Sequence, residues 1–304
     1  MHELWRGNAN AWECDEMGHL NVKAYLGKGM QAIARLTEQA GLAGAFSAGA
    51  MATLRPVEWH VRFLGEARPG APLFIEGGVA RIGDSDADIA LAMRHSGDGR
   101  LAATLTARVE HVVPDSGRVF AWPSRFRGTA EALMVEPLPE SAPRGLPPAD
   151  WSELVSLKRA EALRLFPIGL GRIGSEDADV FGRMRPEFLI GKVSDSVANF
   201  VQAFPDRSLN DEADPKGGAL LECRIRVRRY PRPGDGFAVR SALSGGTDKV
   251  RQIVHWVLDP LTGKPWWTVE GIAATLNLRT RRIEAATPAE LQDIAKAVRD
   301  GLKG

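Results

Sequence analysis

The sequence predicts an α+β protein built from two tandem copies of one unit, each a long helix wrapped by an antiparallel sheet. Three observations support this fold class. An ordered series of residues recurs at one constant spacing along the chain. Each copy places a helical pattern before several patterns that alternate with the period of a strand. A proline-rich stretch separates the two copies.

The repeat is defined by a shift of 164 residues, which carries Asp15-Glu16-Met17-Gly18 onto Asp179-Val180-Phe181-Gly182. The same shift maps Gly27-Lys28, Ala34, Glu58, Arg62, Arg68-Pro69-Gly70 and Gly99 onto Gly191-Lys192, Ala198, Glu222, Arg226, Arg232-Pro233-Gly234 and Gly263. No insertion is needed, and chance does not produce so long an ordered series. We therefore predict an N-terminal unit over residues 1–120 and a C-terminal unit over 160–285.

Within each copy a short apolar strand leads into an Asp-x-x-Gly loop. A helix of about five turns follows, near residues 21–41 and 186–203. Four strands come next, and residues 57–63 alternate apolar and polar side chains as a half-buried strand does. Turn signals separate the strands, for example at residues 68–70 and 98–99.

Residues 121–159 form the predicted linker. Prolines stand at positions 123, 137, 139, 143, 147 and 148. Repeated prolines remove backbone donors and disfavour helix, so we expect an extended linker. Residues 286–304 are predicted to form a C-terminal helix, because Thr287 can cap it, Pro288 suits its first turn and Glu290 completes a capping box.

Composition excludes several classes of function. The chain has 304 residues, 44% of them hydrophobic and 25% charged, as in ordinary two-domain globular proteins. Its net charge is only +1, so we expect no nucleic-acid partner.

The basic run 224–229 alternates with apolar residues and is interpreted as a strand with one solvated face. Two cysteines, Cys14 and Cys223, form neither a disulfide framework nor a metal spacing, and we expect no cofactor or metal.

The N-terminal residues lack the apolar segment of a signal peptide, and no apolar run approaches the roughly 20 residues that span a bilayer. We therefore expect no membrane span and a cytoplasmic location. Residues 169–174 match Gly-x-Gly-x-x-Gly, but acidic residues and no helical pattern follow directly. The repeat makes this segment a strand that enters the Asp179 loop, so we reject a dinucleotide site.

The N-terminal copy contains Asp15, Gly18, His19, Asn21 and Tyr25 in the order Asp-x-x-Gly-His-x-Asn-x-x-x-Tyr. Together with the strand, helix and sheet, this motif resembles the hotdog-fold thioesterases. It is similar to the 4-hydroxybenzoyl-CoA thioesterase branch and to the acyl-ACP thioesterases of plants and bacteria, which also hold two hotdogs in one chain. The resemblance covers most of the sequence.

The resemblance implies a thioesterase that hydrolyses an acyl-CoA or an acyl-carrier-protein thioester to free acid and thiol, in fatty acid metabolism. Acyl-ACP thioesterases usually carry Asn where this chain has Met17, which leaves the choice of carrier open. Two fused units already make the usual hotdog pair, so both a monomer and a homodimer fit. One alternative is a hotdog hydratase, although its His stands five residues after the Asp and His19 stands four after Asp15. The other is a non-catalytic acyl-CoA-binding module.

Site residues follow from this resemblance and from the chemistry of hydrolysis. Asp15 is expected to attack the carbonyl or to activate water. The backbone amide of Val22, at the helix start, is expected to donate to the oxygen that becomes negative. His19 can orient water, hold the carbonyl or protonate the leaving thiolate. Asn21 can hold Asp15 or cap the helix, and Glu58 is a second candidate for the general base.

In the second copy Arg183 replaces His19 and Arg185 replaces Asn21, beside Asp179. Asp179 and Arg183 form either a second site, with arginines binding substrate phosphate or carboxylate, or a site that has lost its activity. Loss of activity or an altered specificity is favoured.

Structural roles compete with some assignments in the first copy. Glu58 also fits a salt bridge with Arg62, and Tyr25 fits core packing. Cys14 is rejected as a nucleophile because neighbouring carboxylates raise the pKa of a thiol.

Overall fold

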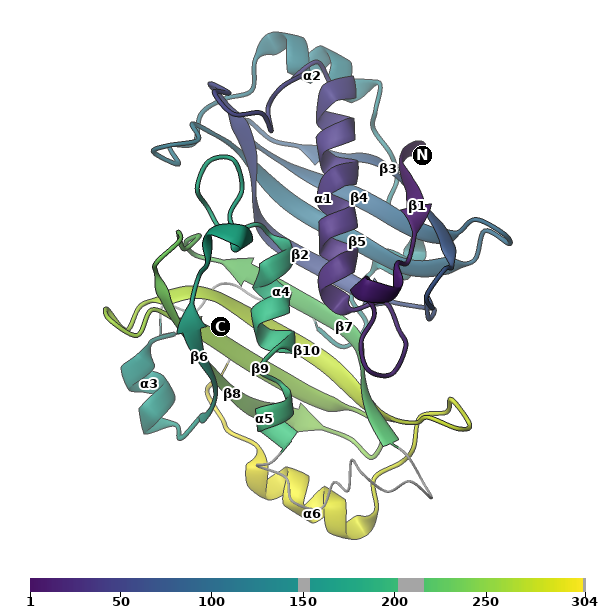
Figure 1. The fold of residues 1–304 in the computed structure, drawn as a ribbon, viewed down its shortest axis with the longest axis vertical. Helices are drawn as coiled ribbons and strands as arrows, with labels where there is room; N and C mark the ends of the chain where they lie inside the picture. Colours follow the sequence, from purple (N-terminus) through teal and green to yellow (C-terminus); the bar gives the residue numbers. More distant parts are fainter. Residues whose placement is uncertain (147–153, 202–215, 303–304) are drawn as a thin grey trace. The chain divides into compact units, whose positions relative to one another are not determined.

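A computed structural model describes residues 1–146, 154–201 and 216–302 of the chain (Figure 1). It divides into two compact units, one formed by residues 1–142 with 176–188 and the other by residues 143–175 with 189–304. The loop that carries Asp179 therefore packs with the first unit, although it belongs to the second copy of the repeat. The repeat boundaries that we drew from the sequence stay a prediction.

The described part of the first unit contains a five-stranded antiparallel sheet in the order β1-β3-β4-β5-β2. Its elements are β1 (His2–Asn8), α1 (Val22–Gln39), β2 (Thr53–Phe63), β3 (Pro72–Ile82), β4 (Asp86–His95), β5 (Leu101–Val112) and α2 (Ser124–Glu131). Two short 3-10 helices, Ala11–Glu13 and Pro139–Ser141, lie before α1 and after α2.

Helix α1 lies along one face of this sheet (Figure 1). It buries an apolar stripe that includes Leu26, Ile33 and Leu36, spaced three and four residues apart as helix periodicity requires. Gly29 lets the helix approach closely, because a Cβ there would come within 3.2 Å of Leu105 and 3.6 Å of Trp59. This packing fixes the start of α1, and with it the loop of Asp15, against the sheet.

The second copy repeats this arrangement with the sheet order β7-β10-β9-β8-β6 among the described strands. The described chain from residue 154 onward contains α3 (Leu157–Ala162), β6 (Phe166–Arg172), α4 (Glu187–Ser194), α5 (Ala198–Val201), β7 (Lys216–Val227), β8 (Gly236–Gly246), β9 (Arg251–Leu258), β10 (Pro265–Asn277) and α6 (Pro288–Ala297). A short 3-10 helix, Ser175–Asp177, follows β6.

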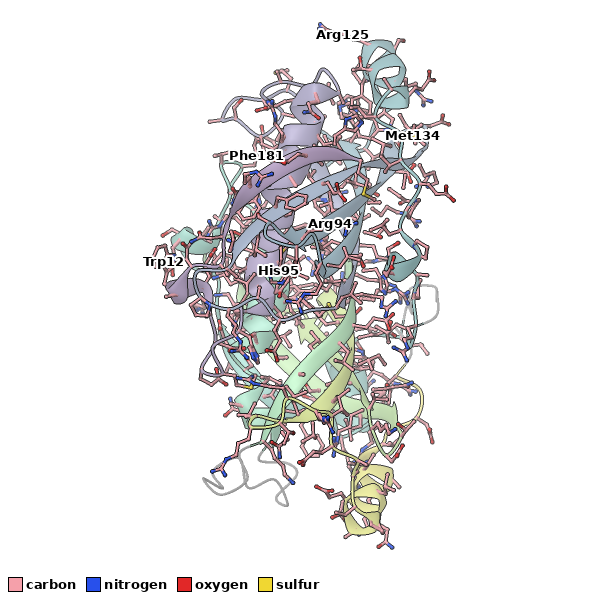
Figure 2. The ribbon with its side chains drawn as sticks, turned by 90° about the vertical axis from the view of Figure 1, so that its right-hand side faces the viewer. Trp12, Arg94, His95, Arg125, Met134 and Phe181 are labelled. Atoms are coloured by element: carbon pink, nitrogen blue, oxygen red, sulfur yellow. The ribbon has the colours of Figure 1, made fainter. Side chains whose placement is uncertain are left out.

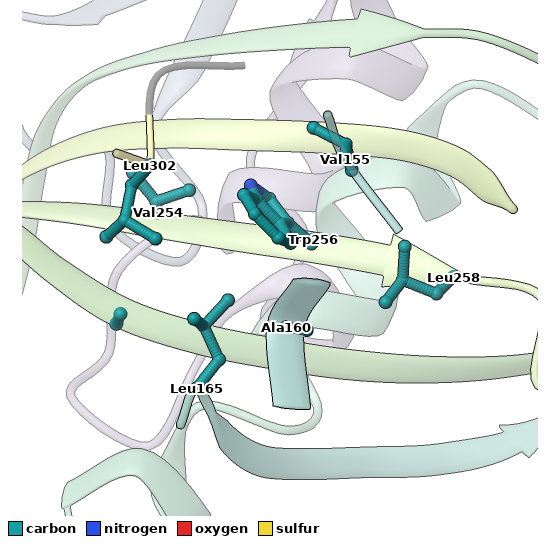
Figure 3. Packing of buried hydrophobic residues seen from close by; sticks show 8 residues of the cluster. Val155, Ala160, Leu165, Val254, Trp256, Leu258 and Leu302 are labelled. Atoms are coloured by element: carbon teal, nitrogen blue, oxygen red, sulfur yellow. The ribbon is translucent and has the colours of Figure 1, made fainter. Parts of the chain in front are cut away.

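Both faces of the second sheet are covered. Helix α4 covers one face, where the indole of Trp267 donates to the carbonyl of Leu189 in α4 at 2.8 Å. The other face carries a cluster around Trp256, which Ala160 of α3 covers (Figure 3). The remaining buried members of the cluster are Val155, Leu165, Ala242, Val254, Leu258 and Leu302.

Backbone geometry confirms the 164-residue shift. Paired glycines adopt nearly the same left-handed conformation in the two copies: φ is 72° and 65° at Gly18 and Gly182, and 71° at both Gly99 and Gly263. The bridge between Cys14 and Leu20 likewise recurs between Ala178 and Met184. The α+β fold class with two tandem units, predicted from the sequence, is therefore confirmed.

The helix expected over 186–203 differs from the observed structure. Helix α4 ends at Ser194, a short α5 covers Ala198–Val201, and residues 202–203 lie outside the described part of the chain. The hydroxyl of Ser196 donates to the carbonyl of Lys192 at 2.8 Å. Such side-chain bonds compete with the helix ladder and explain the break.

The proline-rich linker is not wholly extended. Helix α2 begins directly after Pro123, in a stretch without proline, and prolines 147 and 148 lie outside the described residues. Within the segment predicted as the C-terminal helix, residues 286–304, α6 covers only Pro288–Ala297. Its start has the expected capping box, because Thr287 Oγ1 accepts from the amide of Glu290 and the Glu290 side chain accepts from the amide of Thr287.

Two further patterns can be compared with the structure. Residues 169–172 lie in strand β6, as the repeat predicts, and only a short 3-10 helix, Ser175–Asp177, follows them. The basic run lies in strand β7 as far as Val227, as expected, and Arg228 and Arg229 are exposed. The expected solvated face is wrong for the other two arginines, because Arg224 and Arg226 are buried and both approach Glu270 within 4 Å.

Candidate active site

Asp15 stabilises the loop that precedes α1 through hydrogen bonds within that loop. Its Oδ1 accepts from the amides of Met17 at 3.0 Å and His19 at 2.9 Å. The backbone adds two bonds, from the Asp15 amide to the His19 carbonyl and from the Gly18 amide to the Asp15 carbonyl. Asparagine and aspartate form such turns readily, so one carboxylate oxygen has a structural role.

The second copy forms the same turn around Asp179. There Oδ1 accepts from the amides of Phe181 at 2.9 Å and Arg183 at 3.0 Å. The two loops differ at the other oxygen. Arg183 folds back and donates to Asp179 Oδ2 through Nη2 at 3.1 Å and Nε at 3.3 Å. By contrast, Asp15 Oδ2 accepts no hydrogen bond from any residue that the structure describes.

Helix α1 begins next to this loop. Asn21 is its N-cap, and its Oδ1 accepts from the amide of Lys23 at 2.9 Å. The carbonyl of Asn21 accepts from the amide of Ala24. Within the described chain, the amide of Val22 remains as a first-turn donor without a hydrogen-bond acceptor. It lies at the positive end of the helix dipole, where negative charge is stabilised.

Glu13 joins the loop to the helix. Its carbonyl accepts from the amide of Asn21 at 2.8 Å, and both of its carboxylate oxygens accept from Lys28 Nζ at 2.8 Å. Lys28 is buried, and its ammonium lies 4.9 Å over the ring of Trp5. The residues on either side of Asp15 and Val22 are thereby tied together.

His19 is oriented by a residue that the sequence did not single out. His19 Nε2 lies 3.3 Å from Glu66 Oε1, and the other oxygen of Glu66 lies 3.5 Å from Arg68. The amide of Leu20 donates to the carbonyl of Ala67, which brings the segment after β2 against the loop. The second copy has Arg183 at the position of His19 and Tyr230 at the position of Glu66. A comparison of the two copies could therefore have identified His19 and Glu66 as a pair.

Glu58 lies away from the helix face. Trp59 points toward α1, so strand alternation places Glu58 on the opposite face of β2, in register with Arg108. The predicted partner Arg62 donates to the carbonyls of Glu140 and Ala142. The role of Glu58 as a general base stays a prediction.

Cys14 is not suited to nucleophilic attack. Its thiol donates to the carbonyl of Asn10 at 3.3 Å. Burial, followed by the charges of Asp15 and Glu13, raises the pKa of Cys14, so the thiol form dominates at neutral pH. Trp12, in the short 3-10 helix just before Cys14, is 84% exposed (Figure 2).

Within the described ranges, no group of three or more histidine, cysteine or carboxylate side chains is arranged to hold a metal ion. The described helices also include none that is both long and apolar enough to cross a bilayer.

Several solved structures share this architecture over most of the chain. One is described as an oleoyl thioesterase from Lactobacillus plantarum, with 11% identity, a TM-score of 0.66, and coverage of 93% of this chain and 96% of that chain. An acyl-ACP thioesterase from Bacteroides thetaiotaomicron has 10% identity, a TM-score of 0.66, and coverage of 88% and 96%. A 12:0-ACP thioesterase from Umbellularia californica has 12% identity, a TM-score of 0.64, and coverage of 89% and 93%. The tandem hotdog fold is therefore shared.

No curated protein sequence matches the chain significantly. A family model does match, that of the thioesterase-like superfamily, over residues 9–131 and again over residues 173–298. The two matched segments begin 164 residues apart, as the internal repeat requires. The chain therefore belongs to the thioesterase-like superfamily and carries two copies of its domain in one polypeptide.

Proposed function

We propose that this protein hydrolyses an acyl thioester, carried on coenzyme A or on acyl carrier protein, to a free acid and a thiol. The observation that supports this most is the open Oδ2 of Asp15, in a loop tied to a helix start whose Val22 amide has no acceptor among the described residues. A carboxylate and an unpaired donor are the two groups that acyl transfer to water needs.

Two routes use the same atoms. In the first, Asp15 Oδ2 takes a proton from water while the water oxygen attacks the carbonyl carbon. The carbon–sulfur bond then breaks, and the proton passes to the thiolate. In the second route Oδ2 itself attacks, the thiolate leaves, and water hydrolyses the resulting anhydride. In both, the Val22 amide donates to the carbonyl oxygen as it becomes negative.

His19 supports either route as a polar group beside Asp15. Its ring is directed by Glu66, which favours one orientation of the imidazole. A thiolate leaves readily, so a strong acid is not required, and we assign His19 to orienting water or the carbonyl. Asn21 contributes by capping the helix that presents the Val22 amide.

We further propose that Asp179 is inactive. Both hydrogen bonds from the Arg183 side chain occupy Oδ2, the oxygen that is open in Asp15, and an ion-paired carboxylate is a weak base and a weak nucleophile. Asp179 then still accepts the two amides that form its turn, but it takes no part in the reaction.

The carrier and the location of the reaction are also proposals. Two of the similar structures are named for acyl-ACP substrates and one for an oleoyl substrate, which supports a fatty acyl group. We propose a cytoplasmic enzyme that works without a bound cofactor, as a monomer or a homodimer.

The test is to incubate the full-length protein with acyl-CoAs from acetyl to oleoyl, benzoyl-CoA and the matching acyl carrier proteins, in the presence of a thiol-reactive dye. Release of free thiol is the expected result. Hydration of an enoyl-CoA without thiol release would identify a hydratase, and tight binding without turnover would identify a binding module. Either of these two results contradicts the proposal.

A further inference from the structure

Tyr25 is a buried residue of α1 whose hydroxyl has no hydrogen-bond partner among the described residues. It lies on α1 one turn after Val22, and its side chain is only 4% exposed. The ring packs edge-on against Phe63, with centroids 5.1 Å apart and planes at 88°. Its hydroxyl donates to no residue that the structure describes, yet the oxygen is not fully enclosed. Because the hydroxyl has no protein partner among the described residues and is not fully enclosed, it is available to water or to a bound ligand.

The helix directs this hydroxyl toward the site. Side chains on an α-helix lean back toward its N-terminus, so the tip of Tyr25 lies over the turn that contains the Val22 amide. Asp15, Cys14 and Glu66 are near enough to act on it. Burial is the largest effect and raises the pKa of Tyr25, and these three groups raise it further. The phenol is therefore a neutral hydrogen-bond donor at neutral pH.

The repeat separates packing from chemistry at this position. The shift of 164 residues places Leu189 where the first copy has Tyr25, and Leu189 is fully buried. An aliphatic side chain therefore satisfies the packing requirement of the helix. The hydroxyl occurs in the copy whose Asp15 Oδ2 is open, and it is absent from the copy in which Arg183 occupies Asp179.

We propose that the Tyr25 hydroxyl is a second donor, beside the Val22 amide, to the carbonyl oxygen of the bound thioester. This inference rests on the proposed hydrolysis. As oxygen attacks the carbonyl carbon, the electron pair of the double bond moves to the carbonyl oxygen. The hydroxyl strengthens its hydrogen bond to that oxygen and keeps its proton. When the pair returns, the carbon–sulfur bond breaks and the thiolate leaves.

Tyr25→Phe tests this role, because it removes the hydroxyl and keeps the ring against Phe63. We expect kcat to fall on the order of 10²-fold, as when one oxyanion donor is removed elsewhere, while KM changes by less than about threefold. The melting temperature should stay within about 2 °C of wild type, because packing is retained. Tyr230→Phe, at the only other tyrosine of the chain, is the matched control and should keep wild-type turnover.

A second variant, Tyr25→Leu, reproduces the residue of the second copy and should lose as much rate as Tyr25→Phe. The inference is overturned if either folded variant keeps kcat within twofold of wild type, or if only KM changes. If the wild-type protein releases thiol and Tyr25→Phe does so equally fast, this inference alone fails. If the wild type releases no thiol from any substrate, the proposed function fails and the role of Tyr25 fails with it.

Discussion

Replacing Lys28 by methionine tests how the loop that carries Asp15 is held against α1. The Lys28 side chain is 5% exposed, and its ammonium donates to both oxygens of Glu13 at 2.8 Å. Methionine retains an unbranched apolar stem and removes the charge. Glu13 is then left partly buried without its cation, and the side-chain tie between the loop and the helix is lost, while the bond from the Asn21 amide to the Glu13 carbonyl remains.

The size of the effect follows from the burial of the two partners. Removing one member of a buried ion pair costs about 3–5 kcal/mol. Glu13 is 25% exposed and still accepts from the amide and the side chain of Asn10, so we reduce this to about 2–3 kcal/mol. For a unit of this size, the melting temperature should fall by about 5–10 °C.

The effect should also depend on pH. Burial raises the pKa of Glu13, but the bonds from Lys28 and Asn10 outweigh it, and the net pKa lies below the ordinary value of 4.5. Stability from the pair is therefore complete above pH 4.5 and is lost as the pH falls through the lower pKa of the folded state. The difference between Lys28→Met and wild type should be full at pH 7 and should shrink in acid.

Thermal unfolding followed by circular dichroism measures this difference. Lys296→Met is the control, because Lys296 pairs with Asp293 at the surface with its side chain 75% exposed, and such pairs contribute at most about 1 kcal/mol. Melting of Lys28→Met within 1 °C of wild type at pH 7 would refute the reasoning.

Two further predictions concern stability. Gly99→Ala should lower the free energy of unfolding by about 1–2 kcal/mol, because φ is +71° there. Gly97→Ala is the control and should change it by less than about 0.5 kcal/mol, because φ is not positive there and a Cβ meets no atom; equal urea midpoints for the two variants would contradict this. Burial lowers the pKa of His255 to about 4. Its neutral form therefore favours folding at pH 7, and this contribution should be lost as the pH falls from 6.5 toward 4. Wild type should lose more urea stability than His255→Gln between pH 7 and pH 5, and parallel losses would exclude this role.

The features that the sequence predicted are local ones. The start of α1 depends on Asn21 accepting from an amide two residues later, and the start of α6 on Thr287 and Glu290 exchanging bonds within one turn. The turns around Asp15 and Asp179 are equally local, and their glycines follow the repeat. Short-range geometry of this kind is determined by neighbouring residues, so a pattern in the sequence is sufficient to find it.

The features that the sequence missed depend on contacts between distant segments or on side-chain conformation. The pair of His19 with Glu66 forms only when the segment after β2 returns to the loop. The burial of Arg224 requires the Leu146 carbonyl and Glu270 from other parts of the chain. The ion pair of Arg183 with Asp179 joins near neighbours, but the sequence equally allowed the arginine to face a substrate. Residue spacing alone does not decide such alternatives.

The asymmetry between the two aspartates is the central claim, and comparing Asp15→Asn with Asp179→Asn tests it most directly. Asparagine retains an Oδ1 that can accept the two loop amides, so each turn is preserved while the carboxylate charge is removed. We predict that Asp15→Asn lowers kcat on the order of 10²–10⁴-fold on the best acyl thioester and that Asp179→Asn stays within about twofold of wild type. Near-wild-type turnover by Asp15→Asn, or equal losses in both variants, would contradict the account.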